Sequence, residues 1–162
     1  AALASGFART IDRVLGEGPS TLPEGNVVVW GAGEGIELAL DLAQAGRSVR
    51  LLDPTEKLLP ANYIGSRAGA VNRWMARAGL ASEQGVALSS VGDGKVIVRN
   101  ADGRSETIDC AALVIAPGRA AYDPLSNVLV KTGVEVEVIG DARKPRSYGN
   151  AIHEAAYLAR RI

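Results

Sequence analysis

The stretch from Asn26 to Asp53 constrains the fold more strongly than any other part of the chain. Its pattern predicts four consecutive parts: a β-branched apolar strand (26–30), a glycine segment (31–35), a helix (36–45) and a second strand (48–53). The first strand is apolar on both faces, as strands buried in parallel sheets are. A strand, a glycine loop, a helix and a strand in this order form the repeating unit of a parallel α/β sheet.

The remainder of the chain continues this pattern. Helical spacing predicts a short helix over 7–15, a second over 66–79 and a terminal one over 148–162, and apolar runs predict strands over 113–116 and 134–139. Short strands over 86–91, 95–100 and 106–110 are separated by turns at 92–94 and 101–103 that carry Asp-Gly hairpin signals. The predicted fold class is α/β: a Rossmann-like parallel sheet with helices on both faces and a three-stranded antiparallel β insert.

The glycine segment is suited to a nucleotide diphosphate. Gly31, Gly33 and Gly35 stand between a strand and a helix, where glycines permit a tight turn and let backbone N–H groups face an anion. Asp53 ends the next strand, where an acid accepts hydrogen bonds from the adenosine ribose and repels a 2′-phosphate. Together they predict NAD(H) or an ADP moiety rather than NADP(H).

The loop departs from the full fingerprint, and a purely structural tight turn remains open as its role. The fingerprint has its third glycine three residues after the second, where this chain has Ile36. Gly35 comes one residue early, so the loop is shortened by one. Glu34 also places a negative charge beside the expected diphosphate.

Two further glycine turns follow predicted strands. Gly140 and Asp141 come between the strand 134–139 and the terminal helix, where a carboxylate can bind a ribityl or ribose hydroxyl or can simply cap the turn. Gly118 and Arg119 follow the strand 113–116, where they either face a nucleotide or only end the strand.

Composition narrows the classes of function. Lys and Arg together number 18, as do Asp and Glu, so neither nucleic acid nor a membrane surface is an expected partner. The apolar runs are too short to span a membrane, and the single Cys110 allows no internal disulfide or cysteine-ligated cluster, which favours a cytoplasmic setting. We see no nucleophile–base pair and no metal-ligand spacing, and we expect His153 on a helix surface. The sequence therefore predicts no catalytic and no metal-binding residue in this chain.

Several motifs together resemble one enzyme family. They are 27–37, 49–53 with Lys-Leu-Leu-Pro at 57–60, 113–119, and 136–142 followed by Pro145-Arg146 and by Ala-Ile-His-Glu at 151–154. In these motifs the chain resembles the C-terminal nucleotide-binding region of the multidomain old yellow enzyme relatives, the NADH:flavin oxidoreductase family that includes 2,4-dienoyl-CoA reductase and the trimethylamine and histamine dehydrogenases. The segment 59–63 and the helix after it look more like the amine dehydrogenase branch.

The resemblance implies an enzyme that transfers hydride or electrons between a nicotinamide nucleotide, or an amine or enoyl substrate, and a flavin. It implies that Gly140 and Asp141 face FAD or ADP and that Gly31, Gly33 and Asp53 face the nicotinamide nucleotide. It implies that Gly118 and Arg119 lie where the two nucleotide domains cross. FMN and a [4Fe–4S] cluster are expected only in a missing N-terminal part. The flavin barrel of that part is the expected partner, and an electron-transfer flavoprotein is a second candidate.

The expected organisation has three parts. Residues 1–25 return from a missing FAD-type half, 26–133 form the NAD(P)-type subdomain, and 134–162 supply a strand and a helix of the FAD/ADP-type subdomain. The chain is then a fragment that is inactive by itself. One alternative is a non-catalytic ADP-binding or structural docking domain for an electron-transfer partner. Another is a stand-alone reductase of the disulfide-oxidoreductase type, against which the lack of a cysteine pair argues.

Overall fold

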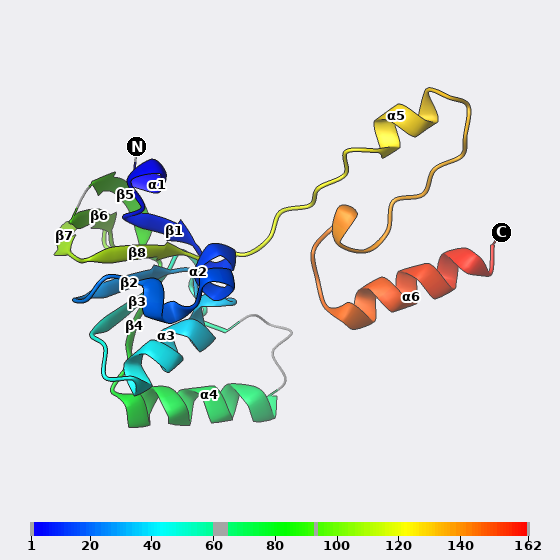
Figure 1. The fold of residues 1–162 in the computed structure, drawn as a ribbon. Coiled ribbons are helices and arrows are strands. Elements are labelled where there is room, and N and C mark those ends of the chain that lie inside the picture. The colour runs from blue at the N-terminus through cyan, green and yellow to red at the C-terminus, as the bar shows by residue number, and fades with distance from the viewer. Residues whose placement is uncertain (1, 60–64, 93, 162) are drawn as a thin grey trace. The chain divides into compact units, whose positions relative to one another are not determined.

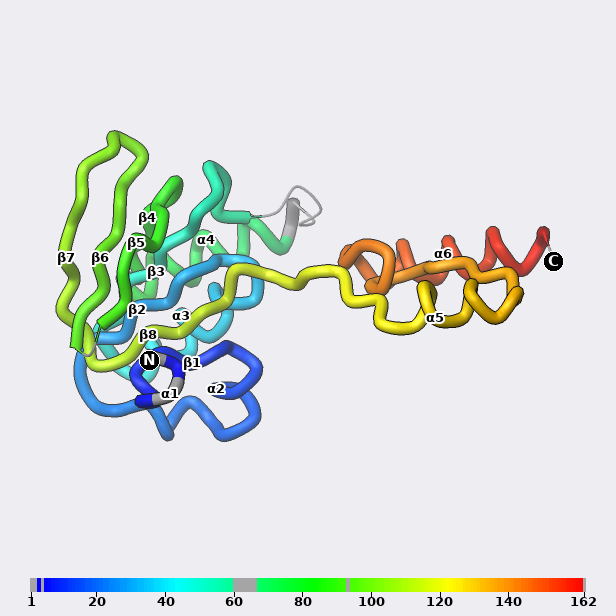
Figure 2. The backbone as a smooth tube through the Cα atoms, turned by 90° about the horizontal axis from the view of Figure 1, so that it is seen from above, coloured from blue at the N-terminus to red at the C-terminus, as the bar shows by residue number. Residues whose placement is uncertain are grey.

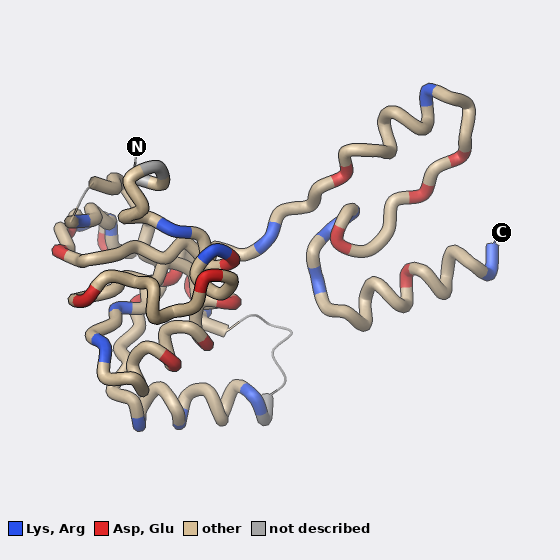
Figure 3. Tube along the Cα trace, in the orientation of Figure 1, with Lys and Arg blue, Asp and Glu red and all other residues tan. Residues whose placement is uncertain are grey.

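The computed structural model describes residues 2–59, 65–92 and 94–161, and it divides into two compact units, Ala1–Gly118 and Arg119–Ile162 (Figure 1). Asp93 of the expected hairpin turn and residues 60–63 of the family motifs lie outside the described residues. None of the helices in the described ranges combines the length and the apolar character that crossing a bilayer requires. Within each unit, acidic and basic residues are interspersed along the chain (Figure 3).

The first unit is built on a five-stranded parallel sheet with the strand order β1-β8-β2-β3-β4. Its strands are β1 (Ala8–Thr10), β2 (Val27–Trp30), β3 (Val49–Asp53), β4 (Ala81–Gln84) and β8 (Ala112–Ile115). β2 lies in the middle and pairs Trp30 with Leu52 of β3 and with Ile115 of β8. The predicted α/β class is confirmed. Because the strands are parallel, the residues that follow β2, β3 and β8 meet at one edge of the sheet.

Three helices cover one face of this sheet. They are α2 (Ile11–Glu17), α3 (Gly35–Gln44) and α4 (Gly65–Ala78), and α3 and α4 lie together on one side of the sheet in Figure 1. Val14, Ile36 and Val71 from these helices form one buried cluster with Val27 and Val29 of β2. Val28, which lies between them in β2, points to the other face, because successive side chains of a strand alternate between its two faces.

The antiparallel insert covers the opposite face. It consists of β5 (Ala87–Gly92), β6 (Lys95–Arg99) and β7 (Ser105–Asp109), which lie beside the parallel sheet in Figure 2. Val96 and Val98 of β6 pack with Val28 of β2 and Leu113 of β8 in a second buried cluster. The predicted insert is confirmed, but helices cover one face only in the described part of the chain, because the insert already buries the apolar residues of the other.

An ion-pair cluster joins the insert to the sheet. Arg50 of β3 donates hydrogen bonds to Glu83 of β4 and to Glu106 of β7, the latter at 2.6 Å between Nη1 and Oε1. The hydrogen bond with Glu106 raises the pKa of Arg50, and the same hydrogen bond lowers the pKa of Glu106 below its usual value. The cluster thereby links three strands that belong to two different sheets.

The N-terminal segment differs from its prediction. The structure has β1 followed by α2 where one helix over 7–15 is predicted, and the short helix α1 (Ala2–Ser5) precedes β1. The side chain of Thr10 accepts a hydrogen bond from the N–H of Arg13, so α2 begins only after Thr10. Ala8 pairs with Leu113 and is 1% exposed, so this segment is part of the sheet. A 3-10 turn, η1 (Pro19–Thr21), follows α2.

The second unit contains α5 (Ser126–Val130), the 3-10 turn η2 (Gly140–Ala142) and α6 (Tyr148–Ala159). α6 confirms the predicted terminal helix, and Ser147 starts it through a capping box with Asn150. The predicted strand over 134–139 is wrong, since this segment belongs to no strand. A strand needs a neighbour to accept and donate its backbone hydrogen bonds, and the described part of this unit contains no other strand.

Candidate nucleotide-binding site

The chain leaves β2 through Gly31, a position that only glycine can occupy. Its φ is +107°, and a Cβ there would lie 2.0 Å from the carbonyl oxygen of Ala116. The Gly31 N–H donates to the carbonyl oxygen of Leu52 at 2.7 Å. Gly31 is therefore wedged between the ends of β8 and β3 and makes the tight turn that the first fingerprint glycine makes.

Gly35 begins α3 and lets the helix approach the sheet closely. A Cβ at this position would lie 2.9 Å from Cγ1 of Val29 and 3.1 Å from Cβ of Ala116. In the full fingerprint, the third glycine provides this close packing of helix against strand. Gly35 does so one residue earlier, and Ile36, which takes the fingerprint position, is fully buried in the core.

Gly33 is the glycine of the loop that internal packing does not explain. Its φ is ordinary, and no atom lies within 4 Å of the position that its Cβ would take. The residue is exposed, as is Glu34 after it. Backbone N–H groups in the first turn of a helix have no intrahelical partners and attract anions. Gly33 thus leaves the approach to the N-terminus of α3 open, which is the role of the second fingerprint glycine.

Asp53 lies beside the loop with its carboxylate directed inward, and it is 5% exposed. Oδ2 accepts a hydrogen bond from the N–H of Ala32 at 2.5 Å, and Oδ1 accepts one from the N–H of Thr55 at 2.8 Å and another from the Thr55 hydroxyl. The fold therefore brings the loop and the acid together, as expected. Ala32 and Thr55 are partners that sequence reasoning missed. Ala32 is 21 positions from Asp53, so its contact leaves no local signal, whereas Thr55 is only two residues away, in a turn that the sequence analysis did not consider. These bonds use the carboxylate oxygens that the ribose contact predicted from the sequence would require.

Gly118 follows β8 at the same edge of the sheet. Its φ is +104°, and no atom would lie within 4 Å of its Cβ. Gly118 ends the first unit and Arg119 begins the second. A nucleotide-facing role for these two residues also stays a prediction.

Gly140 and Asp141 form the turn η2 of the second unit. Gly140 has a φ of +62°, and its N–H donates to Oε2 of Glu154 in α6 at 2.8 Å. Glu154 also accepts a hydrogen bond from Arg146. These contacts hold the turn against the helix and leave the Asp141 side chain exposed. Glu154 is thus the residue that orders the turn; it belongs to a family motif, but the motif alone did not indicate this role.

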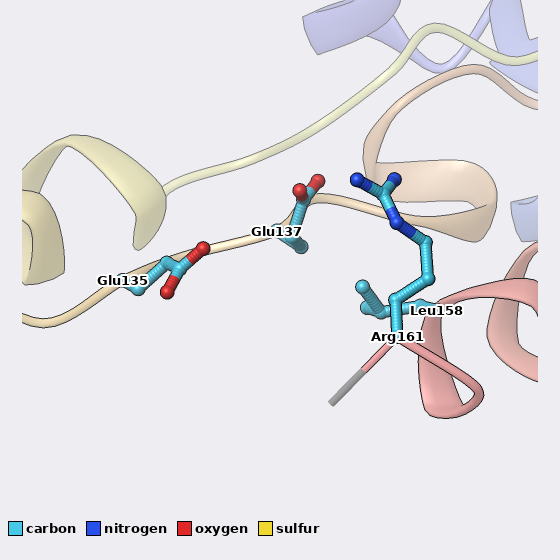
Figure 4. Close-up of a pocket in the computed structure, with 4 residues that line it drawn as sticks. All are labelled: Glu135, Glu137, Leu158 and Arg161. Carbon is cyan, nitrogen blue, oxygen red and sulfur yellow. The ribbon is translucent and has the colours of Figure 1, made fainter.

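The second unit also contains a hollow of about 590 Å³ lined by Glu135, Glu137, Leu158 and Arg161. In Figure 4 the carboxylate of Glu137 and the guanidinium of Arg161 point into the same space. Two acids and one arginine give no surplus of positive charge, and none of the predicted site residues lines the hollow. We therefore assign it no part in binding a diphosphate.

Other reactive groups are few. Among the residues that the structure describes, no three His, Cys, Asp or Glu side chains gather closely enough to hold a metal ion. Cys110 is buried, and this burial, with the negative charge of Asp109, raises the pKa of the thiol to about 11. His153 is exposed on α6, which confirms its predicted surface position.

No protein-family model and no curated protein matches this chain. Solved structures do. A 2-naphthoyl-CoA reductase, in complex with 2-naphthoyl-CoA, is 27% identical with a TM-score of 0.75, over 94% of this chain and 23% of that one. Histamine dehydrogenase from Rhizobium sp. 4-9 is 22% identical with a TM-score of 0.78, over 96% of this chain and 24% of that one. The 6-hydroxypseudooxynicotine amine oxidase HisD from Pseudomonas geniculata N1 is 24% identical with a TM-score of 0.74, over 93% and 24%.

The chain therefore spans about a quarter of the length of the structures that it matches. At 22% and 24% identity the two amine-oxidising enzymes show the fold, and the reductase adds a match of 27%. By their names, a reductase, a dehydrogenase and an amine oxidase, all three are oxidoreductases. The resemblance drawn from the sequence motifs is confirmed: over nearly its whole length, this chain is similar to one part of the multidomain old yellow enzyme relatives.

Proposed function

We propose that this chain is the nucleotide-binding portion of a flavin-dependent oxidoreductase and that the loop 31–35 receives the diphosphate of NAD(H) or ADP. Hydride or electrons would pass between a nicotinamide nucleotide, or an amine or enoyl substrate, and a flavin, and the cofactors supply that chemistry. The chain itself binds and orients the nucleotide. The residues that act on the substrate belong to other parts of the longer enzyme.

The observation that carries this proposal is the difference between the three glycines of the loop. Backbone and side-chain atoms of the fold require glycine at Gly31 and at Gly35, but nothing within 4 Å requires it at Gly33. A ligand that approaches the backbone at this position would explain why the residue there has no side chain. The N-terminus of α3 lies directly after it and favours a negatively charged ligand.

Glu34 opposes the same ligand. It is exposed at the N-cap position of α3, where its side chain makes no capping hydrogen bond. Two like charges about 4 Å apart in water repel each other by about 1 kcal/mol. A repulsion of this size raises the dissociation constant about fivefold. We therefore expect modest affinity for nucleotides, and we expect Glu34→Gln to strengthen diphosphate binding by at most about fivefold at low salt.

We propose that the second unit contributes to a FAD- or ADP-binding surface through Asp141. Since the Gly140 N–H is taken by Glu154, a ligand at this turn would meet the exposed Asp141 carboxylate, which accepts hydrogen bonds from hydroxyl groups. No residue described between 119 and 161 is buried, and large apolar side chains such as Tyr122, Leu125 and Tyr148 are exposed. This supports a unit that packs against another part of a longer protein.

Calorimetric titration of the 162-residue chain with NADH, NADPH, ADP and FAD tests the proposal. We expect binding of NADH or ADP, weakened about tenfold or more by Gly33→Val because the added side chain blocks the backbone approach. Gly92→Val is the matched control, since Gly92 also has an ordinary φ and open space around its Cβ but lies in β5. Equal loss in both variants, or no response of the wild-type chain to any of the four nucleotides, contradicts the proposal.

Glu34 also favours a second candidate, in which the chain docks an electron-transfer partner without binding a nucleotide. A carboxylate at the mouth of the loop is tolerated there because no diphosphate has to enter. In that case the wild-type chain would bind none of the four nucleotides, and it would bind a purified electron-transfer flavoprotein. The two candidates are thus separated by the same titration.

A further inference from the structure

Asp53 ends the strand after the glycine loop, where a Rossmann fold has the acid that binds the adenosine ribose, yet its carboxylate is turned away from solvent. It is the one charged side chain that is buried among the described residues. Both oxygens already accept hydrogen bonds: Oδ2 from the N–H of Ala32, and Oδ1 from the N–H and the hydroxyl of Thr55. An ionised carboxylate has about four lone-pair positions, so three of them are used inside the protein.

These bonds fix the course of the loop. Two consecutive amides of the loop are tied to the end of β3, because Gly31 donates to the backbone carbonyl of Leu52 and Ala32 donates to the side chain of Asp53. The next residue is Gly33, whose open side faces the approach to α3. A carboxylate that accepts from a backbone N–H is a strong and directional partner, so Asp53 determines where the backbone of Gly33 lies.

We propose that Asp53 is a positioning residue for the glycine loop and that it makes no hydrogen bond to the ribose. The inference rests on the proposed nucleotide site and states what that site recognises: the diphosphate and not the 2′,3′-diol. With 5% of its surface exposed and its oxygens bonded to Ala32 and Thr55, Asp53 presents almost nothing to a ligand. The site therefore accepts adenine nucleotide diphosphates with or without ribose hydroxyls.

The test compares ADP with 2′,3′-dideoxy-ADP as ligands of the 162-residue chain. For the wild-type chain we expect dissociation constants within about twofold of each other, because a hydrogen bond to a charged group would separate them by about tenfold or more. Asp53→Asn should weaken both ligands by the same factor, since the loop is displaced for both. Asp41→Asn, the same chemical change at an exposed position of α3, is the control and should change neither.

A preference of the wild-type chain for ADP over 2′,3′-dideoxy-ADP of about tenfold or more would overturn the proposal. The comparison of ligands on the wild-type chain needs no variant, so it remains decisive even if Asp53→Asn does not fold. If the wild-type chain binds neither ligand, the proposed nucleotide site fails.

Hydrogen exchange then tests the role of Asp53 independently of any ligand. The amide of Ala32 should exchange at least about tenfold faster in Asp53→Asn than in the wild-type chain or in Asp41→Asn, because its acceptor is weakened. An unchanged exchange rate at Ala32 refutes the positioning role.

Discussion

Replacing Gly35 by alanine tests whether the shortened glycine loop packs as the structure indicates. The new Cβ would lie 2.9 Å from Cγ1 of Val29 and 3.1 Å from Cβ of Ala116. Neither neighbour can move easily: Val29 is 0% exposed and is restricted at χ1 by its branched Cβ, and the Cβ of Ala116 is fixed to the backbone of a core residue. We therefore expect the helix α3 to shift away from the sheet or the core to be strained.

The magnitude follows from two opposing effects. Overpacking a well-packed core by one methyl group costs about 1–3 kcal/mol. Alanine in place of glycine in a helix returns up to about 1 kcal/mol, and less at the first helical position, where Gly35 stands. The net expectation is a loss of about 1–2 kcal/mol, which lowers the midpoint of thermal unfolding by about 2–8 °C for a protein of this size.

Urea unfolding followed by near-ultraviolet circular dichroism measures this loss. Gly33→Ala, two residues earlier in the same loop, is the matched control, because its Cβ would meet no atom within 4 Å. Its free energy of unfolding should stay within about 0.5 kcal/mol of the wild-type value. If Gly35→Ala is as stable as Gly33→Ala, the close approach of α3 to β2 and β8 is not what requires glycine, and the reasoning is refuted.

Three further outcomes are expected. The hydrogen bond with Arg50 lowers the pKa of Glu106, so its stabilising effect is complete above the ordinary glutamate pKa of about 4.3 and is lost as the pH falls through the lower folded value. Because the Glu106 side chain is 38% exposed, Glu106→Gln should cost less than about 1 kcal/mol at neutral pH, and this difference should vanish at acid pH in urea titrations. Cys110, buried and with its pKa raised to about 11, should react with iodoacetamide at pH 8 only when urea unfolds the chain; equal rates without urea would contradict its burial. Glu154→Ala should speed exchange of the Gly140 amide about tenfold or more while the middle of α6 stays protected, as measured by nuclear magnetic resonance.

The elements that sequence patterns predicted are those whose signals are local and strong. β2 and α3 carry a β-branched run and helical spacing, and the insert carries hairpin turns, so each was found within a few residues of its observed bounds. β4 was missed because Ala-Ser-Glu-Gln has no apolar alternation, and it is a strand only because it pairs with β3 at the edge of the sheet. β1 was taken for part of a helix for the same reason, since its pairing with β8 lies about a hundred residues away in the chain.

The sequence predicted which residues make up the candidate site, but it did not predict the structural role of each one. The spacing of the glycines indicated a loop at the edge of the sheet, and the departure at Ile36 weakened the expectation of a ligand. In the structure, Gly35 allows α3 to pack closely against the sheet, whereas no neighbouring atom requires glycine at position 33. That distinction depends on Val29 and Ala116, whose positions relative to the loop no local pattern contains.

By itself the sequence determined the order of strand, glycine loop, helix and strand, because branching at Cβ, the absence of a side chain in glycine and helical periodicity all act within a few residues. Only the tertiary structure decided at which loop positions neighbouring atoms leave no room for a Cβ, and in which direction the carboxylate of Asp53 points. Ala116 and Ala32 reach these positions only when distant strands have paired. The tertiary structure also decided that 134–139, despite its strand pattern, forms no strand here. A strand exists through hydrogen bonds to a neighbour, and an alternating sequence supplies only one of the two partners.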